Sequence, residues 1–111
     1  IFIMRRGEVW WVEFDPGIGS EIRKTRPAII VSNDSANRHL SRVVVVPVTS
    51  NIDRIYPGEV LIYVGEQAAK AMSDQIMAAD KGRLKNRLAE LSASDLSLVE
   101  NAIKIHLGLP I

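Results

Sequence analysis

RVVVVPVT, at residues 42–49, is the segment that decides the fold. Between Arg42 and Thr49 every residue is apolar, and most are valine, which favours strands. A strand that has one face in water alternates apolar and polar residues, whereas this run is nearly continuous. The sequence therefore predicts a strand here with both faces covered by other parts of the chain.

The flanking sequence predicts further strands on both sides of this run. Residues 8–14 (EVWWVEF) and 27–32 (PAIIVS) are rich in aromatic and β-branched side chains, and we expect Pro27 at the first strand position, where no ladder donor is needed. Residues 59–64 predict a fourth strand and residues 71–78 a weaker fifth.

Glycine, proline and polar residues separate these strands. They predict a loop after the first strand, a turn or short helix over residues 33–38, and a second polar loop over residues 50–58, which is broken by Pro57 and Gly58.

The last third of the chain changes from strand to helix patterns. Asp80 can cap a short helical turn over residues 81–84, and residues 87–91 predict a sixth strand. Ser92 and Asp95 have the spacing of a capping box. An apolar stripe at helical spacing follows, formed by Leu96, Val99, Ala102, Ile103 and Leu107. We therefore expect a mainly β (α+β) fold, a small curved β barrel of five to six strands with a short helix and a C-terminal helix.

Length and composition exclude several classes of protein. The 111 residues predict a single domain over 1–111, and the absence of cysteine excludes disulfides, cysteine-ligated metals and thiol nucleophiles. A net charge of +1 excludes a broadly basic nucleic-acid binder but allows a local patch. The apolar runs are too short for a membrane helix, so we expect a cytoplasmic protein. Residues 1–5 are expected to be flexible or a non-native start, with Met4 as the natural start unless upstream residues are missing.

Several short strings carry a resemblance that covers residues 6–109. They are RGEVWWVEFDP at 6–16, GSE at 19–21, RP at 26–27, VSND at 31–34, VPVTSN at 46–51, DQ at 74–75 and LGL at 107–109. In this order and spacing they are similar to the MazF/PemK toxins of type II toxin–antitoxin systems.

The resemblance implies both a fold and an activity. It implies an SH3-like barrel, a homodimer and a cognate MazE-like antitoxin with a disordered acidic segment. It also implies a sequence-selective endoribonuclease that inhibits translation and growth, needs no metal or other cofactor and cleaves single-stranded RNA (mRNA, or rRNA or tRNA). Cleavage through the 2′-hydroxyl would leave 2′,3′-cyclic phosphate and 5′-hydroxyl ends. Met72 and Met77 stand where relatives can carry basic residues, so the recognised RNA sequence is not carried over.

The resemblance also implies the site residues. Arg26 and Thr49 match the catalytic positions, and a guanidinium can grip phosphate oxygens with two donors. The family arginine is treated as acid, base or both; its high pKa disfavours the base role, and Glu21 is a second candidate proton acceptor. The expected RNA-binding residues are Gly19, Ser20, Glu21, Lys24, Ser50, Asn51, Asp74 and Gln75, with Asp74 and Gln75 on the fifth strand.

Other conspicuous residues receive structural interpretations. His39 and His106 are expected to be surface or packing residues, not an acid–base pair. Trp10 and Trp11 point to opposite faces of a strand, so we expect one in the core and the other on a dimer or antitoxin surface. The alternating basic residues are expected to form a solvated turn; they are Lys81, Arg83, Lys85 and Arg87.

Two other functions remain open at this point. The same barrel could form a non-catalytic protein-binding toxin, such as a CcdB-like gyrase poison, or an inert adaptor. Neither would need Arg26 and Thr49 beside the loop that carries Gly19.

Overall fold

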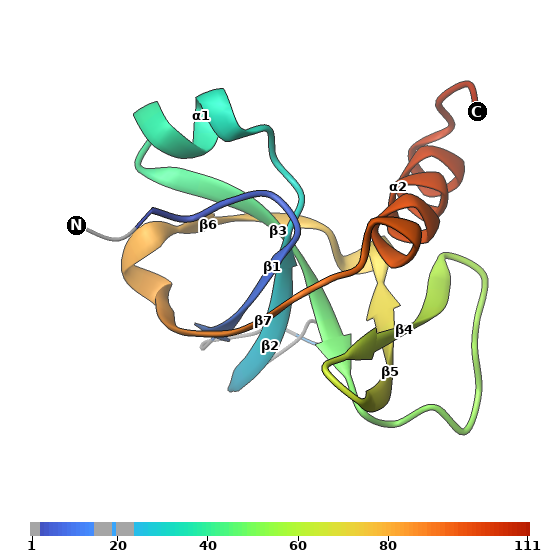
Figure 1. The fold of residues 1–111 in the computed structure, drawn as a ribbon. Helices are drawn as coiled ribbons and strands as arrows, with labels where there is room; N and C mark the ends of the chain where they lie inside the picture. Colours follow the sequence, from blue (N-terminus) through green and yellow to red (C-terminus); the bar gives the residue numbers. More distant parts are fainter. Residues whose placement is uncertain (1–2, 15–18, 20–23) are drawn as a thin grey trace.

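The computed structural model describes residues 3–14, 19 and 24–111, and these form a mainly β structure (Figure 1). The strands are β1 (Glu8–Glu13), β2 (Thr25–Ile30), β3 (Arg42–Thr49), β4 (Glu59–Val64), β5 (Gln67–Met72), β6 (Met77–Asp80) and β7 (Leu84–Glu90). The helices are α1 (Asp34–His39) and α2 (Ala93–Leu107), with short 3₁₀ helices η1 (Ser73–Gln75) and η2 (Lys81–Arg83). Within these residues no helix is both long and apolar enough to cross a membrane.

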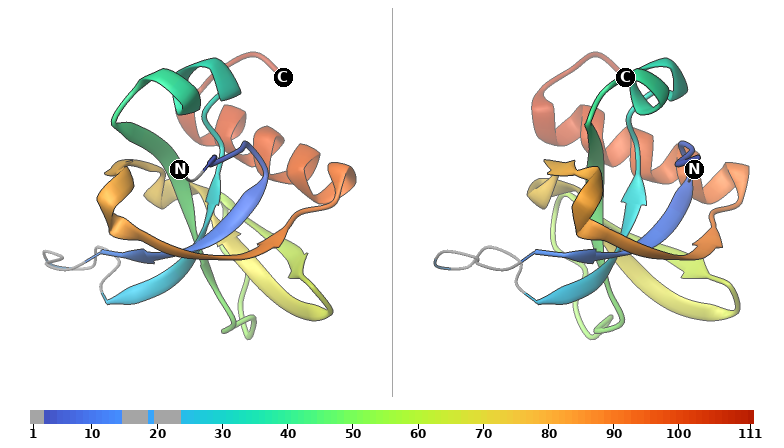
Figure 2. Two further views of the ribbon diagram at one scale, coloured as in Figure 1. Left: turned by 60° about the vertical axis from the view of Figure 1, so that its left-hand side comes forward. Right: turned by 90° about the vertical axis from the view of Figure 1, so that its left-hand side faces the viewer.

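The strands form one curled antiparallel sheet in the order β4-β5-β3-β2-β1-β7. β3 connects its two halves, because β6 pairs with β3 from Arg42 to Val45 and β5 pairs with it at Val48 and Thr49. The sheet curls strongly, and α2 lies across one side of it, next to β4 (Figure 2). The expected small curved barrel with a short helix and a C-terminal helix is confirmed.

β3 is covered on both faces, as its continuous apolar sequence predicts. Val43 and Val45 belong to one buried cluster, together with Trp10 of β1. Val46 and Val48 belong to a second cluster, which also contains Val99 of α2. Each face of the strand therefore supports its own core.

α2 is fixed at both ends by its sequence. The Ser92 hydroxyl accepts the Asp95 backbone N–H at 3.1 Å, which is half of the expected capping box. The Asp95 carboxylate accepts from the Tyr63 backbone N–H of β4 at 2.9 Å and so ties the helix to the sheet. Gly108, at φ +70°, ends the helix in the left-handed region that glycine tolerates.

The prediction of a fifth strand over residues 71–78 is wrong. β5 ends at Met72, η1 follows, and β6 starts at Met77, which gives seven strands in the described chain instead of five to six. The break occurs where Ser73, fully buried, donates its backbone N–H to the carbonyl of Gly58 at 3.0 Å. This contact turns the chain from one end of β3 to the other.

The predicted start of the second strand is also wrong. β2 begins at Thr25, so Pro27 is its third residue. The ladder between β2 and β3 begins only at Ala28, which pairs with Pro47. Pro27 therefore lies where β2 has a strand neighbour on one side only, an edge-like position that tolerates a missing N–H.

Candidate active site

The candidate site lies where β2 and β3 separate. Their ladder ends at Ala28 and Pro47. Beyond this point β2 continues beside β1, with Arg26 opposite Val12, while β3 continues beside β5, with Thr49 opposite Lys70. The separation leaves a cleft of about 480 Å³ that Arg26 and Thr49 both line.

Four of the predicted site residues line this cleft. Arg26, Thr49, Lys24 and Ser50 come from β2, β3 and the segments that adjoin these strands. Although they lie far apart in the sequence, the splitting of the ladder brings them together. A guanidinium, an ammonium and two hydroxyls can together bind an anionic phosphodiester.

The Thr49 side chain is oriented by the chain that follows it. Its half-buried hydroxyl oxygen accepts the Asn51 backbone N–H at 3.2 Å. Because that bond occupies an acceptor position, the hydroxyl hydrogen is available to donate into the cleft. Thr49 can thus act as a hydrogen-bond donor to a phosphate oxygen.

Lys24 lies in a strained conformation next to Arg26. It has φ +66°, the left-handed region, which costs a non-glycine residue of the order of 1 kcal/mol. The Lys24 carbonyl accepts the Phe14 backbone N–H at 2.9 Å and closes the base of the intervening segment. Gly19, exposed at φ +62°, belongs to that segment, whereas Ser20 and Glu21 lie outside the described residues.

Like Gly19, three further predicted RNA-binding residues are not among those that line the cleft. Asn51 is exposed, and its side-chain oxygen accepts the Asp53 backbone N–H at 3.2 Å. Asp74 and Gln75 lie on η1 and not on a strand, so that placement was wrong. Asp74 is exposed, and the Gln75 amide donates to the sulfur of Met72 at 3.8 Å.

Sequence reasoning missed part of the cleft wall. Trp10 is buried and donates its indole N–H to Glu8 at 3.1 Å, whereas Trp11 is 37% exposed and lines the cleft. Leu88 of β7 and Gln67 of β5 line it as well. Strand alternation places Trp11 and Leu88 outside the core, but their meeting depends on sheet curvature, which the sequence does not display.

The two histidines lie elsewhere. His39 is exposed on α1, with its ring nitrogen Nδ1 2.9 Å from the Ser35 carbonyl oxygen. His106 is exposed on α2 beside Gly58. Neither lines the cleft, and the described ranges contain no group of acidic or histidine side chains that could hold a metal ion.

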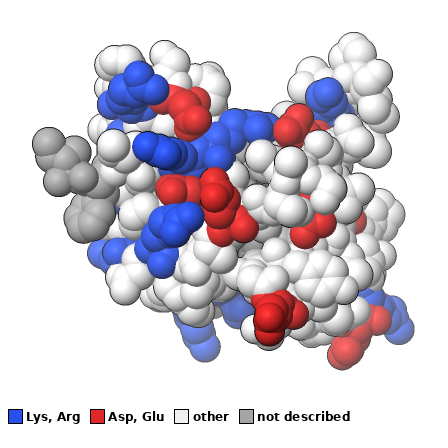
Figure 3. Space-filling model, in the orientation of Figure 1, with Lys and Arg blue, Asp and Glu red and all other residues white. Residues whose placement is uncertain are grey.

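Basic residues outside the cleft are interleaved with acidic ones. Figure 3 shows positive and negative side chains alternating on one face of the molecule. Lys85 and Arg87 of β7 form ion pairs with Glu13 and Glu8 of β1 at 3.9 and 2.9 Å. Arg83 also donates to the Glu13 carbonyl at 3.0 Å, so much of the alternating run ties β7 to β1.

Two comparisons with known proteins find similar sequences. A family model described as the PemK-like, MazF-like toxin of type II toxin–antitoxin systems matches residues 5–107. Endoribonuclease MazF9 of Mycobacterium tuberculosis is 43% identical over 96% of this chain and 98% of its own length.

Two solved structures have the same fold. The crystal structure of MazF from Deinococcus radiodurans has a TM-score of 0.86 at 28% identity and covers 98% of this chain and 100% of its own. A mycobacterial endoribonuclease in complex with its cognate antitoxin has a TM-score of 0.82 at 28% identity, with 97% and 98% covered.

Proposed function

This chain belongs to the PemK-like, MazF-like toxins of type II toxin–antitoxin systems and is an endoribonuclease, and we propose that it cleaves single-stranded RNA through the RNA's own 2′-hydroxyl. The observation that carries the proposal is the cleft that Arg26 and Thr49 both line. The products are a 2′,3′-cyclic phosphate and a 5′-hydroxyl, and the cleavage needs no metal. Its targets are cytoplasmic RNAs, and their loss stops translation and growth.

The residues of the cleft are proposed to stabilise the charge that develops on the phosphate during cleavage. Attack of the 2′-oxygen on phosphorus builds negative charge on the non-bridging oxygens of a pentacoordinate phosphorane. Arg26 stabilises that charge with two N–H donors, and Thr49 donates its hydroxyl hydrogen to one of the same oxygens. Lys24 and Ser50 hold the flanking backbone phosphates.

Two proton transfers complete the reaction. A base removes the 2′-hydroxyl proton, and an acid protonates the leaving 5′-oxygen. Arg26 is the proposed acid and would regain its proton from water, while Glu21 is the candidate base. Gly19, Ser20, Asn51, Asp74 and Gln75 are proposed to contact the RNA beyond the cleft.

We propose two macromolecular partners. One is a second copy of this chain in a two-fold dimer, which would cover exposed apolar side chains such as Tyr63 of β4 and Leu98 of α2. The other is a MazE-like antitoxin whose acidic segment lies over the cleft beside Lys24 and Arg26 and excludes RNA. Solved MazE–MazF complexes from Deinococcus radiodurans supply the precedent.

RNA cleavage in the presence of EDTA tests the proposal. Purified protein is incubated with a long single-stranded RNA, and the ends of the fragments are mapped. We expect cuts at a short recurrent sequence, 5′-hydroxyl ends, and 3′ ends that accept ligation only after the cyclic phosphate is opened. Intact RNA together with inhibition of DNA gyrase would instead support the protein-binding alternative, which the relatives' names do not favour.

A further inference from the structure

A buried ion pair lies beside Thr49, on the neighbouring strands β5 and β4. Lys70, at 8% exposure, is the cross-strand neighbour of Thr49 on β5. Its ammonium is 3.0 Å from the carboxylate of Glu59, and both side chains are 9% exposed. Lysine is seldom buried to this extent unless it is paired, and this pair is not among the cleft-lining residues.

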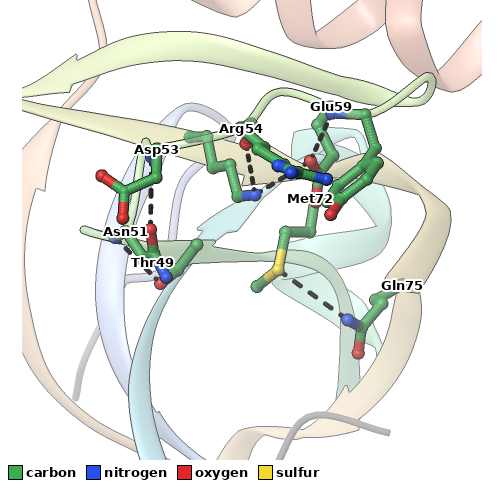
Figure 4. Close-up of polar contacts among 9 residues, drawn as sticks. Thr49, Asn51, Asp53, Arg54, Glu59, Met72 and Gln75 are labelled. Atoms are coloured by element: carbon green, nitrogen blue, oxygen red, sulfur yellow. Dashed lines mark hydrogen bonds and ion pairs between the residues drawn. The ribbon is translucent and has the colours of Figure 1, made fainter. Parts of the chain in front are cut away.

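The pair binds the loop that follows Thr49 (Figure 4). Lys70 donates to the Arg54 carbonyl at 2.8 Å, and its ammonium lies 5.3 Å from the centre of the Tyr56 ring. Glu59 accepts the Tyr56 backbone N–H at 2.8 Å with the same oxygen that pairs with Lys70. The loop is thus held at two backbone positions by one ion pair.

The held loop leads back to the Thr49 hydroxyl. Asp53 donates its backbone N–H to the Asn51 side chain, and Asn51 donates its backbone N–H to Thr49, both at 3.2 Å. Thr49 and Arg54 are therefore the two ends of a closed ring, because Lys70 is the strand neighbour of the first and the hydrogen-bond partner of the second. Loss of the Lys70 bond to the Arg54 carbonyl would open that ring.

We infer that Lys70 is a positioning residue, which aligns the Thr49 hydroxyl by anchoring residues 50–56 through Arg54, with Glu59 fixing the ammonium. Lys70 itself does not contact RNA, because β5 and the loop enclose it. The inference rests on the proposed function, since it presumes that Thr49 donates to the phosphate. An alignment error of about 1 Å in such a donor can cost up to about a hundredfold in rate.

A double-mutant cycle in single-turnover RNA cleavage tests the inference. We expect Lys70→Met to lower the rate at saturating enzyme about tenfold with half-saturation within twofold, and Thr49→Ala to lower it about a hundredfold. The combined variant should match Thr49→Ala, because Lys70 acts through that hydroxyl. A further tenfold loss in the combined variant would overturn the inference, as would a wild-type rate for Lys70→Met.

Further variants separate positioning from folding. Lys70→Met leaves Glu59 buried without its partner, so Lys70→Met with Glu59→Gln removes both charges and keeps an oxygen for Tyr56. This pair should show the same tenfold loss, together with faster amide hydrogen exchange at residues 50–56. Lys85→Met, at an exposed lysine of β7, is the matched control and should keep the wild-type rate and exchange.

The outcomes distinguish the two proposals. A fully active Thr49→Ala variant would sink the proposed role of Thr49 and this inference with it. An impaired Thr49→Ala beside a fully active, folded Lys70→Met/Glu59→Gln variant would sink the inference alone. Unchanged hydrogen exchange at residues 50–56 would do the same.

Discussion

The two ends of β3 differ in what surrounds the backbone. At Val45 the strand has β6 on one side and β2 on the other. At Thr49 it has β5 on one side, opposite Lys70, and the cleft on the other. The first end uses its hydrogen-bonding groups for the fold, whereas the second leaves a polar side chain beside an open space. The same valine-rich strand is therefore part of the core at Val45 and reaches the candidate active site at Thr49.

We call the Thr49 end of β3, beside the cleft, its open end, and the part around Val45, between β6 and β2, its closed end. The largest expected effect is in the cleft at the open end. Arg26→Ala should lower the single-turnover cleavage rate by two to three orders of magnitude, since a lost charged donor to the transition state typically costs about 3–4 kcal/mol. The unfolding free energy should change little, because Arg26 is half-buried at the cleft and not in the core.

The matched control for Arg26 is Arg42, an exposed arginine at the first position of β3. Arg42→Ala removes the same charge at the opposite end of β3 from Thr49. Its cleavage rate should stay within about twofold of wild type. Comparable losses in the two variants would mean that overall charge, and not the cleft, determines the rate.

A smaller effect is expected at the closed end, in stability instead of rate. Val45→Ala should lower the unfolding free energy by about 2 kcal/mol, because it removes two methyl groups from a fully buried position and leaves a cavity. Urea denaturation measures the loss. Leu40→Ala, at a side chain 51% exposed, should cost less than about 0.5 kcal/mol.

The cleavage rate of folded Val45→Ala should equal that of wild type. A rate that falls with stability would indicate that the two ends of β3 are coupled through the strand, and the contrast between them would fail.

Side-chain pattern and turn chemistry carry much of this architecture. The boundaries predicted for β3 and β4 match the structure, because valine runs and the Pro57–Gly58 turn are local signals. The break at Ser73 was not predictable, since it depends on a contact with Gly58, fifteen residues earlier in the chain. Local pattern cannot encode a contact of that kind.

The site divides in the same way. Arg26 and Thr49, which both line the cleft, were found through the family strings, because each string is a short continuous piece of the sequence. Trp11 and Leu88 were missed as cleft residues, because β1 and β7 bring them there only after the sheet curls. Lys70 was also missed, since neither an ion pair with Glu59 nor a bond to Arg54 has a sequence signature.

A still smaller effect concerns acid stability near the closed end. The backbone N–H of Arg6, at 2.7 Å, lowers the pKa of Asp34 below its ordinary value, and Asn37 and the nearby arginines add to this. Since the unfolded chain then binds the proton more readily, the contribution of Asp34 is present above about pH 4 and is lost as pH falls through the lowered pKa. Asp34→Asn should therefore lose less stability than wild type between pH 6 and pH 3.

Urea denaturation of both proteins at the two pH values checks this. The difference should be small, because Asp34 is exposed and solvent screens it. An equal acid loss in wild type and variant would show that the Arg6 contact does not bias the titration.

No effect on the cleavage rate is expected from replacing His39 or from removing metal ions. His39 is exposed on α1 and does not line the cleft, so His39→Ala should cleave RNA at the wild-type rate. EDTA should leave both proteins equally active, because the proposed reaction draws its charge stabilisation from Arg26 and its donors from the protein. Single-turnover assays with and without EDTA, after thermal melts to establish folding, measure both. An inactive but folded His39→Ala would reassign the general base from Glu21 to His39, and a rate abolished by EDTA would replace Arg26 with a cation as the group that stabilises the phosphorane.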